Sequence, residues 1–396
     1  MEWKEVDICQ LCDSVSETYK GNASEVVLIN TSDVLDGKCL NHEYVPNKKL
    51  KGQFKKTFRK GDILYSEIRP ANKRFCFVDF EPKDYIASTK LMVLRAHEDV
   101  DPQYLYQILR SNDTLGQLQM LAESRSGTFP QITYSELSNI MVSLPSQKAQ
   151  KNIVSILSSL DRKIELNNKI NADLEEMAQA IFKNWFVDFE PFKDGKFVDS
   201  ELGMIPEGWK VGTLKDLLYL RKDSIKAANK GNLPYLPIDT IPMHCLVATD
   251  FKSNDEAKSS LQTFEQNDIV VGAMRVYFHR VILAPCKGIT RTTCFVLSVK
   301  NENALAYSLM QCNQDEAISF AEKTSKGSTM PYAVWDGGYG EYKVVIPPSE
   351  VMKSFNDLLS NFFSKMNKNT IENSRLSLLR DTLLPRLMSG EIEVPE

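Results

Sequence analysis

Several features that catalytic or membrane proteins need are missing from this sequence. It contains only four histidines among 396 residues, and their spacing indicates neither a zinc site nor a catalytic triad. No apolar run approaches the ~20 residues that cross a bilayer, and the residues after Met1 do not resemble a signal peptide. No phosphate-binding loop of the Gly-x-x-x-x-Gly-Lys-Ser/Thr type occurs. We therefore expect a cytoplasmic protein with no membrane partner and no nucleotide site of that type.

Motifs for metal binding and base methylation are incomplete. Cys9 and Cys12 form a Cys-x-x-Cys, but no second pair follows, so the eight cysteines are expected to be reduced and structural. Residues 232–235 (Asn-Leu-Pro-Tyr) only partly match the Asn-Pro-Pro-aromatic loop that holds a flipped adenine, and no glycine-rich cofactor turn accompanies them. Asp62 is better interpreted as a turn residue before a strand than as a nuclease carboxylate. We predict no catalytic residue, metal or cofactor in this chain.

The charge balance is slightly acidic, with a net charge of −4 at pH 7, so a surface covered in positive charge is excluded. One stretch departs from this balance, because residues 44–61 contain lysine and arginine but no acidic residue. Such a run is either a solvated loop or a phosphate-contacting one. On the second interpretation, Lys55, Lys56 and Arg59 position the protein on a nucleic acid without reading its sequence.

Two long segments carry the clearest periodicity in the chain. Residues 145–188 and 348–390 each continue for about 40 residues with apolar side chains at alternating steps of four and three, which is a heptad pattern. The first seam comprises Ile153, Leu157, Leu160, Ile164, Leu174, Ala178, Ile181 and Trp185. The second comprises Phe355, Leu359, Phe362, Met366, Leu376, Leu383 and Leu387. At 1.5 Å per residue, each helix would be roughly 60 Å long.

Asparagines interrupt both seams at equivalent positions. Asn167 and Asn171 lie in the first helix, and Asn369 and Asn373 lie in the second at a constant offset of 202. Buried asparagines reduce stability but set register and orientation, because only one alignment satisfies their amides. We predict that the two helices pack on each other with the asparagine layers opposed; the alternative is two independent surface helices.

The repeat extends to the segments that precede the long helices. Trp3 matches Trp209, Arg69 matches Arg275 and Arg74 matches Arg280, all at an offset of 206. Short strands are predicted in both halves, together with a helix at 102–109 in the first half and one at 302–312 in the second. The class is α+β, formed by an internal duplication. The predicted segments are a globular domain at 1–144, a spacer helix at 145–188, a linker loop at 189–208, a second globular domain at 209–347, a second spacer helix at 348–390 and a tail at 391–396.

Duplicated halves are commonly related by an approximate two-fold axis, which would make the helices antiparallel. Two globular domains related in this way match double-stranded DNA, because each domain can read one half-site separately. Arginine and lysine suit guanine, asparagine and glutamine suit adenine, and serine and threonine suit either. The predicted DNA-reading residues of the first half are Arg69, Lys73, Arg74, Arg125, Ser126, Thr128 and Gln131. Those of the second half are Arg275, His279, Arg280, Lys326, Ser328 and Tyr332.

Four stretches carry a family likeness: Lys-Ile-Glu-Leu-Asn-Asn-Lys-Ile-Asn at 163–171, Ile-Phe-Lys-Asn-Trp-Phe-Val-Asp-Phe at 181–189, Leu-Gly-Met-Ile-Pro-Glu-Gly-Trp at 202–209 and Leu-Pro-Arg-Leu-Met-Ser-Gly-Glu-Ile at 384–392. With them the chain resembles the specificity subunit of type I restriction-modification enzymes. The resemblance implies two target-recognition domains that read a bipartite, asymmetric DNA site.

The resemblance also implies partners. Two modification subunits, which methylate adenine at N6 using S-adenosylmethionine, would dock on the helices, and restriction subunits, which translocate DNA with ATP and Mg²⁺, would join through them. This chain would itself be non-catalytic. A coiled-coil adaptor that binds only proteins is the alternative, against which the paired arginines of the two halves argue.

Overall fold

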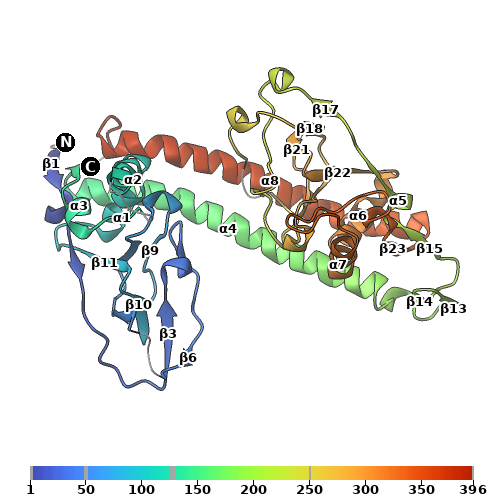
Figure 1. Ribbon diagram of the computed structural model, residues 1–396, viewed down its shortest axis with the longest axis horizontal. Coiled ribbons are helices and arrows are strands. Elements are labelled where there is room, and N and C mark those ends of the chain that lie inside the picture. Colours follow the sequence, from blue (N-terminus) through green and yellow to red (C-terminus); the bar gives the residue numbers. More distant parts are fainter. Residues whose placement is uncertain (1–2, 49–51, 125–129, 249–250, 395–396) are drawn as a thin grey trace. The chain divides into compact units, whose positions relative to one another are not determined.

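The computed structural model describes residues 3–48, 52–124, 130–248 and 251–394. The chain divides into two compact units, of which unit 1 comprises residues 1–160 and 379–396 and unit 2 comprises residues 161–378. Both mix helices and sheets, so the α+β class predicted from the sequence is confirmed (Figure 1). Within the described ranges, no helix is long and apolar enough to cross a membrane.

The described residues of unit 1 form two four-stranded sheets and two smaller strand pairs. Its strands are β1 Lys4–Asp7, β2 Cys12–Val15, β3 Glu25–Ile29, β4 Val34–Leu35, β5 Lys38–Cys39, β6 Val45–Pro46, β7 Phe54–Lys56, β8 Ile63–Ser66, β9 Phe75–Phe77, β10 Tyr85–Ser88, β11 Leu91–Ala96 and β12 Met141–Leu144. One sheet has the antiparallel order β2-β11-β8-β9. The other has the order β6-β3-β10-β7, with β3 and β10 parallel. The smaller pairs are β1-β12 and β4-β5.

Three short helices cover the first of these sheets, namely α1 Pro102–Arg110, α2 Asn112–Ser124 and α3 Tyr134–Ser138. Helix α1 begins where the sequence predicts, because the Asp101 side chain accepts hydrogen bonds from the backbone N–H groups of Gln103 and Tyr104. Its fully buried Tyr104 and Leu105 belong to the same apolar cluster as Ile63 of the sheet. This cluster is the main core of unit 1.

Unit 2 repeats this plan. Its strands are β13 Phe197–Ser200, β14 Gly203–Pro206, β15 Lys210–Thr213, β16 Leu218–Leu220, β17 Ser224–Ile225, β18 Leu261–Phe264, β19 Ile269–Gly272, β20 Val281–Leu283, β21 Gly288–Arg291, β22 Cys294–Val299 and β23 Lys343–Ile346. Its short helices are α5 Leu214–Leu217, α6 Leu305–Cys312 and α7 Asp315–Lys323. The order β16-β22-β19-β20 reproduces β2-β11-β8-β9, and β15-β23 reproduces β1-β12. The duplication seen in the sequence is therefore also a duplication of topology.

A buried aspartate stands before the equivalent central strand of each unit. Asp62 accepts hydrogen bonds from the backbone N–H of Arg59 and from Nε and Nη2 of Arg95, each at 2.8 Å. Asp268 accepts from the backbone N–H of Glu265 at 2.7 Å and from Nη1 of Arg221 at 3.3 Å. Arg95 is on β11, whereas Arg221 follows β16. The equivalent buried carboxylates of the two units are therefore hydrogen-bonded by arginines from different strands. The interpretation of Asp62 as a turn residue is confirmed.

The two long helices are α4 (Gln147–Phe186) and α8 (Ser349–Met388), shown in green and red in Figure 1. In unit 1, Ile153 and Leu157 of α4 share the core with Leu384 and Leu387 of α8. In unit 2 the later part of α4 and the earlier part of α8 share the other large core. Each end of each helix is therefore part of a globular core rather than a separate arm.

The asparagine layers face each other within unit 2, as predicted. Nδ2 of Asn167 donates to Oδ1 of Asn373 at 2.9 Å, and Nδ2 of Asn369 donates to Oδ1 of Asn171 at 2.8 Å. Residue numbers rise along one helix as they fall along the other, so the two segments are antiparallel here. Nδ2 of Asn373 also donates to Oδ1 of Asn168 at 2.8 Å, which extends the polar layer.

The predicted seam is shifted by one residue at its aromatic positions. Phe182 and Phe186 are buried where Ile181 and Trp185 were expected, and Phe363 is buried in place of Phe362. The centroid of the Phe186 ring lies 4.7 Å from that of Tyr307, so this part of α4 faces the globular core of unit 2 as well as α8. A strict heptad describes only a helix with a single partner, and here there are two.

The prediction that residues 189–208 form a linker loop is wrong in part. The segment contains the 3₁₀ helix Glu190–Phe192 and the antiparallel hairpin β13-β14. Its glycines and prolines conceal the hairpin in the sequence, although Gly203 supplies the left-handed backbone (φ 92°) that such a tight turn needs. The ring of Phe192 lies 4.9 Å from that of Trp209, so this segment packs against the start of the second repeat.

Candidate nucleic-acid interface

An unusual backbone conformation occurs at equivalent places in the two units. After β8, a 3₁₀ helix of residues 70–72 stands between Arg69 (φ 46°) and Lys73 (φ 51°). After β19, a 3₁₀ helix of residues 276–278 stands between Arg275 (φ 51°) and His279 (φ 49°). A residue with a Cβ pays roughly 1–2 kcal/mol to adopt this left-handed conformation. Strain of this kind, kept in both copies, is typical of functional loops.

A second loop lies beside each strained loop. The backbone N–H of Arg69 donates to the carbonyl of Pro130 at 3.0 Å, and that of Arg275 donates to Pro331 at 2.7 Å. Gln131 forms a β-bridge with Ile68, and the equivalent Tyr332 forms one with Met274. We name these arrangements loop pair 1 (residues 69–73 with 130–131) and loop pair 2 (residues 275–279 with 326–332). Each brings together predicted DNA-reading residues that are distant in the sequence.

Loop pair 2 is closed by its own backbone. The N–H of Lys326 donates to the carbonyl of Tyr332, and the N–H of Tyr332 donates back to that of Lys326, both at 2.9 Å. Arg275, Lys326, Ser328 and Tyr332 are all exposed. The described residues place no carboxylate within ion-pair distance of Arg275 or Lys326. These side chains therefore offer cationic, hydroxyl and aromatic contacts next to one another, which suits the readout of base edges.

Loop pair 1 presents a smaller set. Arg69 and Lys73 are exposed, and Gln131 is half-buried. The N–H of Ala71 donates to Oε1 of Gln119 on α2 at 3.1 Å, which anchors the strained turn to that helix. The predicted contacts Arg125, Ser126 and Thr128 lie outside the described residues.

Two predicted DNA-reading arginines are structural instead. Nη1 of Arg74 donates to the carbonyls of Ser32 and Val34 at 3.0 and 3.4 Å. The equivalent Arg280 donates from Nη1 to the carbonyls of Ile238 and Ile241, the latter at 2.8 Å. Both arginines stand directly after the strained loop and tie an outer segment to it. The repeated arginine in the sequence therefore reflects a shared fold requirement.

Two further predictions are corrected by burial. His279 is only 4% exposed and cannot face DNA as Arg275 does. Lys56 is half-buried, and its Nζ donates to the carbonyl of Leu91 at 2.8 Å; burial lowers the pKa of this amine. Lys55 and Arg59 are exposed, so they stay predicted phosphate contacts. The sequence could not separate Lys55 from Lys56, since alternation on strand β7 decides which side faces the core.

Some exposed residues of loop pair 2 were missed from the sequence. Tyr277 is 42% exposed within the strained turn, and Met330 is 51% exposed at the neighbouring loop. An aromatic side chain can stack on bases or pack against a thymine methyl group. The only available signal was that Tyr277 takes the place of Ala71 in the first repeat, which marks a difference between the two halves.

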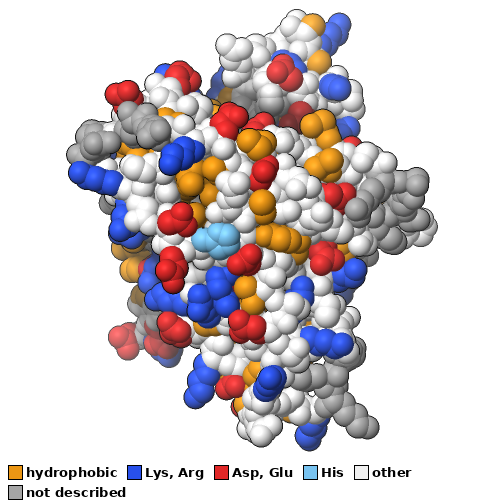
Figure 2. Space-filling view, turned by 90° about the vertical axis from the view of Figure 1, so that its left-hand side faces the viewer, with side chains coloured by type: hydrophobic (Ala, Val, Ile, Leu, Met, Phe, Trp, Pro, Cys, Tyr) orange, Lys and Arg blue, Asp and Glu red, His pale blue; other side chains and the backbone are white. Residues whose placement is uncertain are grey.

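The face displayed in Figure 2 carries mixed charge. Figure 2 shows lysine, arginine, aspartate and glutamate side chains interspersed over the face that it displays. Strong binding through the phosphate backbone needs a concentration of positive charge. The net charge of −4 gives no such excess over the chain as a whole.

The motifs considered for catalysis have structural roles. Tyr235 is 4% exposed and forms β-bridges with Lys252 and Ile289, so residues 232–235 hold no flipped base. Burial raises the pKa of the Cys12 thiol to about 12, which disfavours the thiolate that a zinc site needs. All eight cysteines are free, as predicted.

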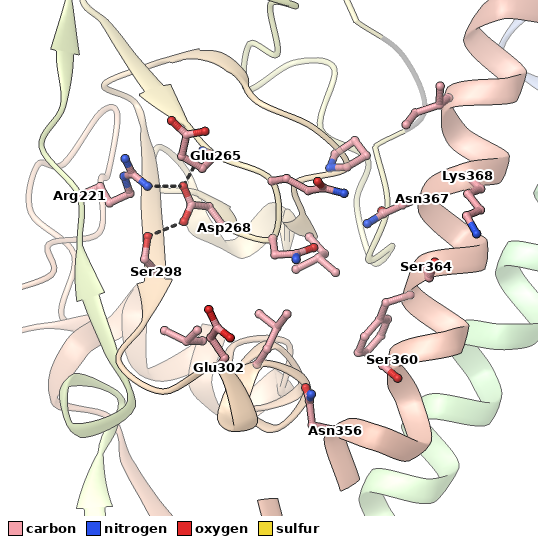
Figure 3. Close-up of a pocket in the computed structure, with 18 of the residues that line it drawn as sticks. Arg221, Glu265, Asp268, Ser298, Glu302, Asn356, Ser360, Ser364, Asn367 and Lys368 are labelled. Atoms are coloured by element: carbon pink, nitrogen blue, oxygen red, sulfur yellow. Dashed lines mark hydrogen bonds and ion pairs between the residues drawn. The ribbon is translucent and has the colours of Figure 1, made fainter. Parts of the chain in front are cut away.

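A polar cleft of about 670 Å³ separates the sheet of unit 2 from α8. Figure 3 shows Arg221, Asp268 and Ser298 on one wall, while Ser360, Ser364 and Lys368 project from α8 on the other. Burial raises the pKa of Asp268, and its hydrogen bonds to Ser298 and Glu265 oppose that effect. The Asp268 carboxylate is therefore occupied by internal partners.

Comparison with known proteins identifies relatives with similar sequences. A family model described as the type I restriction modification DNA specificity domain matches residues 2–176. The type I restriction enzyme HindI specificity subunit of Haemophilus influenzae is 31% identical, over 99% of this chain and 100% of its own length. The type I restriction enzyme MjaIX specificity subunit of Methanocaldococcus jannaschii is 27% identical, over 90% of this chain and 85% of its own.

A solved structure shares the fold. The crystal structure of the type I restriction-modification system S subunit from M. genitalium aligns with a TM-score of 0.56 at 15% identity. The alignment covers 100% of this chain and 97% of the other. The likeness therefore includes both repeats and both long helices.

Proposed function

The chain belongs to the family of specificity subunits of type I restriction-modification enzymes, and from this premise we propose that it reads a bipartite, asymmetric DNA site. Loop pair 1 reads one half-site and loop pair 2 the other. The observation that carries the proposal is the repeated strained loop, which presents Arg69 in one unit and Arg275 in the other beside a second loop. Arginine is the commonest specific partner of guanine in the major groove.

The differences between the loop pairs support an asymmetric target. Lys73 corresponds to the buried His279, and Ala71 corresponds to the exposed Tyr277. Two surfaces that differ at such positions select different bases, because each base pair presents its own donors and acceptors in the major groove. The unread gap between the half-sites would follow from the long helices.

We propose that the helices also bind the partner subunits. Leu166 and Met177 of α4 and Leu358 and Leu378 of α8 are between 43% and 70% exposed. Large apolar side chains on a solvent-facing helix surface are typical of sites where another protein packs. Two adenine-N6 methyltransferase subunits would bind there, carrying S-adenosylmethionine, and restriction subunits using ATP and Mg²⁺ would join through them in the cytoplasm. On this proposal the present chain contributes recognition and no catalysis.

Methylation sequencing tests the proposal directly. The chain is expressed with the methyltransferase subunit of its own system in a host free of that modification, and the host genome is sequenced for N6-methyladenine. The expected result is one motif with two unlike specified halves and an unspecified gap. Exchanging residues 1–143 for the equivalent domain of a relative should change one half only. A continuous motif, or loss of both halves after the exchange, would contradict it.

Affinity provides a second test. Because the chain has a net charge of −4, partner subunits are expected to supply much of the phosphate neutralisation. The purified chain alone should therefore bind its target weakly at physiological salt. A tight, sequence-specific complex of the chain alone would oppose this part of the proposal.

A further inference from the structure

Unit 2 contains a cluster of potential metal ligands that the DNA-reading role does not use. His244, His279 and Asp315 each offer one ligand atom, and the three atoms lie within 4.8 Å of one another. They come from three segments: a loop, the end of the strained turn, and the first residue of α7. All three line a cavity of about 740 Å³. Their distance along the sequence explains why spacing gave no sign of a site.

The hydrogen bonds of His279 orient its ring for metal binding. Its Nε2 lies 3.0 Å from the backbone carbonyl oxygen of Asn313, which can only accept, so this nitrogen carries a proton. In the neutral ring, Nδ1 then carries a lone pair. Histidine ligands of metals commonly donate their other ring N–H to a backbone carbonyl in this way. The buried position of the ring, 4% exposed, keeps this orientation.

The lone pair of His279 faces a carboxylate. Nδ1 lies 3.1 Å from Oδ1 of Asp315, and the two electron-rich atoms repel each other unless a positive charge lies between them. Either a proton on Nδ1 or a bound cation supplies that charge. The ligand–ligand distance across a tetrahedral zinc ion is roughly 3.3 Å for bonds of about 2.0–2.1 Å. The observed separation therefore fits two ligands of one ion.

His244 is held beside this pair by its backbone. Its N–H donates to the carbonyl of His279 at 2.8 Å, and the two imidazole centroids are 4.5 Å apart. Both histidines have left-handed backbones, with φ of 50° and 49°. Two strained residues that converge on one point, with an exposed carboxylate opposite, form a donor set of two imidazoles and one carboxylate.

We propose that His244, His279 and Asp315 form a binding site for a divalent transition-metal ion of the zinc class. Imidazole nitrogen favours zinc and its neighbours over magnesium and calcium, which prefer all-oxygen sites. The cavity that the three residues line leaves room for water to complete the ligand set. Unit 1 has Lys73 in place of His279, so the site belongs to unit 2 alone.

The site has a consequence for loop pair 2. The strained turn begins at Arg275 and ends at His279, so an ion held by His279 fixes one end of the turn that presents Arg275. This consequence rests on the proposed function, whereas the metal site itself does not. Direct metal binding is therefore measured without DNA.

The test uses the full-length chain, freed of metal by a chelator and titrated with Co²⁺, whose visible spectrum reports tetrahedral nitrogen and oxygen ligation. We expect one Co²⁺ per chain, displaced by Zn²⁺. His244→Asn and Asp315→Asn should each weaken binding by at least about tenfold, since loss of even an outer partner of a ligand costs about 10–100-fold. Both side chains are exposed, so neither change creates a cavity in the core.

His97→Asn is the matched control. Nε2 of His97 lies 3.2 Å from a carboxylate oxygen of Asp13, but this pair is not part of any cluster of three ligands among the described residues. Its removal should leave the Co²⁺ spectrum and stoichiometry unchanged. The absence of a spectral change with the wild-type chain, or equal binding by all three variants, would overturn the proposed site. Unaltered methylation specificity in the variants would remove only the link to loop pair 2.

Discussion

At the scale of single residues, Arg275 is exposed and strained, and its N–H is hydrogen-bonded to a second loop. We expect Arg275→Ala to lose about 1–3 kcal/mol of discrimination at one base pair of one half-site, because a bidentate guanine contact is of that size. The measurement is the methylation rate of the assembled enzyme on the matched duplex and on duplexes with single substitutions. Discrimination equal to wild type at every position would contradict the assignment.

Two further variants separate contact from strain. Arg275→Gly also removes the guanidinium, but glycine adopts a positive φ without steric cost, so this variant should be more stable than Arg275→Ala by about 1 kcal/mol. Arg275→Ala and Arg275→Gly should show the same loss of discrimination. Lys196→Ala, at an exposed site near the hairpin β13-β14, should leave discrimination unchanged.

Because Glu175 on α4 is buried, we expect the stability of the protein to depend on pH. Glu175 is 6% exposed, its Oε2 accepts from the N–H of Leu246 at 3.0 Å, and burial raises its pKa. A carboxyl whose pKa is higher in the folded than in the unfolded chain binds its proton more tightly when folded. Its contribution to stability therefore falls as pH rises from the ordinary pKa through the raised one, and the loss is complete above it.

We accordingly expect Glu175→Gln to flatten the dependence of unfolding free energy on pH above the ordinary pKa of a glutamate, and to gain most over wild type at pH values above the raised pKa. Urea denaturation at several pH values measures this. Glu176→Gln is the control, because Glu176 is the exposed neighbour on the same helix. A steeper loss of stability with rising pH in Glu175→Gln would refute the buried-carboxylate explanation.

At the scale of elements, the asparagine layer decides how α4 meets α8. Asn369→Leu removes the donor to Oδ1 of Asn171 and leaves that buried oxygen unsatisfied, which should cost about 1–3 kcal/mol. The double change Asn171→Leu with Asn369→Leu removes both partners and should recover most of this loss. A double-mutant cycle of urea denaturation measures the coupling. If the double variant is no more stable than the single one, the pair does not act as a unit.

At the scale of the whole molecule, the proposed unread gap depends on the length of the two helices. We expect that one heptad inserted after Asp161 of α4 and another before Leu378 of α8 will lengthen the gap by about three base pairs, since seven helical residues add roughly 10 Å. Methylation sequencing of a host with this variant gives the gap directly. An unchanged gap would show that something other than the helices sets the spacing. Insertion into one helix alone should abolish methylation, because it moves Ile153 and Leu157 of α4 out of register with Leu384 and Leu387 of α8.

Much of the fold was predictable because its signals are local. Strands β8, β11, β19 and β22 are runs of β-branched and apolar residues, and α1 is opened by an aspartate cap and a proline. The parallel pair β3-β10 was not predicted, because parallel strands are not joined by a short hairpin and their pairing leaves no local signal in the sequence. In the candidate site, Arg69, Arg275 and Lys326 were chosen by residue type and are exposed, and their contact with DNA stays a prediction. The internal hydrogen bonds of Arg74 and Arg280 could not be predicted, because they depend on carbonyls far along the chain.

By itself the sequence determined the duplication, the two long helices and the opposed asparagines, since offset and periodicity are properties of residue order. It also determined the family, because the matching stretches are linear. Only the tertiary structure decided that the strained turns meet their second loops, that His279 is buried, and that His244 and Asp315 lie beside it. Those outcomes depend on contacts between distant segments, which residue order constrains only through packing and hydrogen bonding in three dimensions.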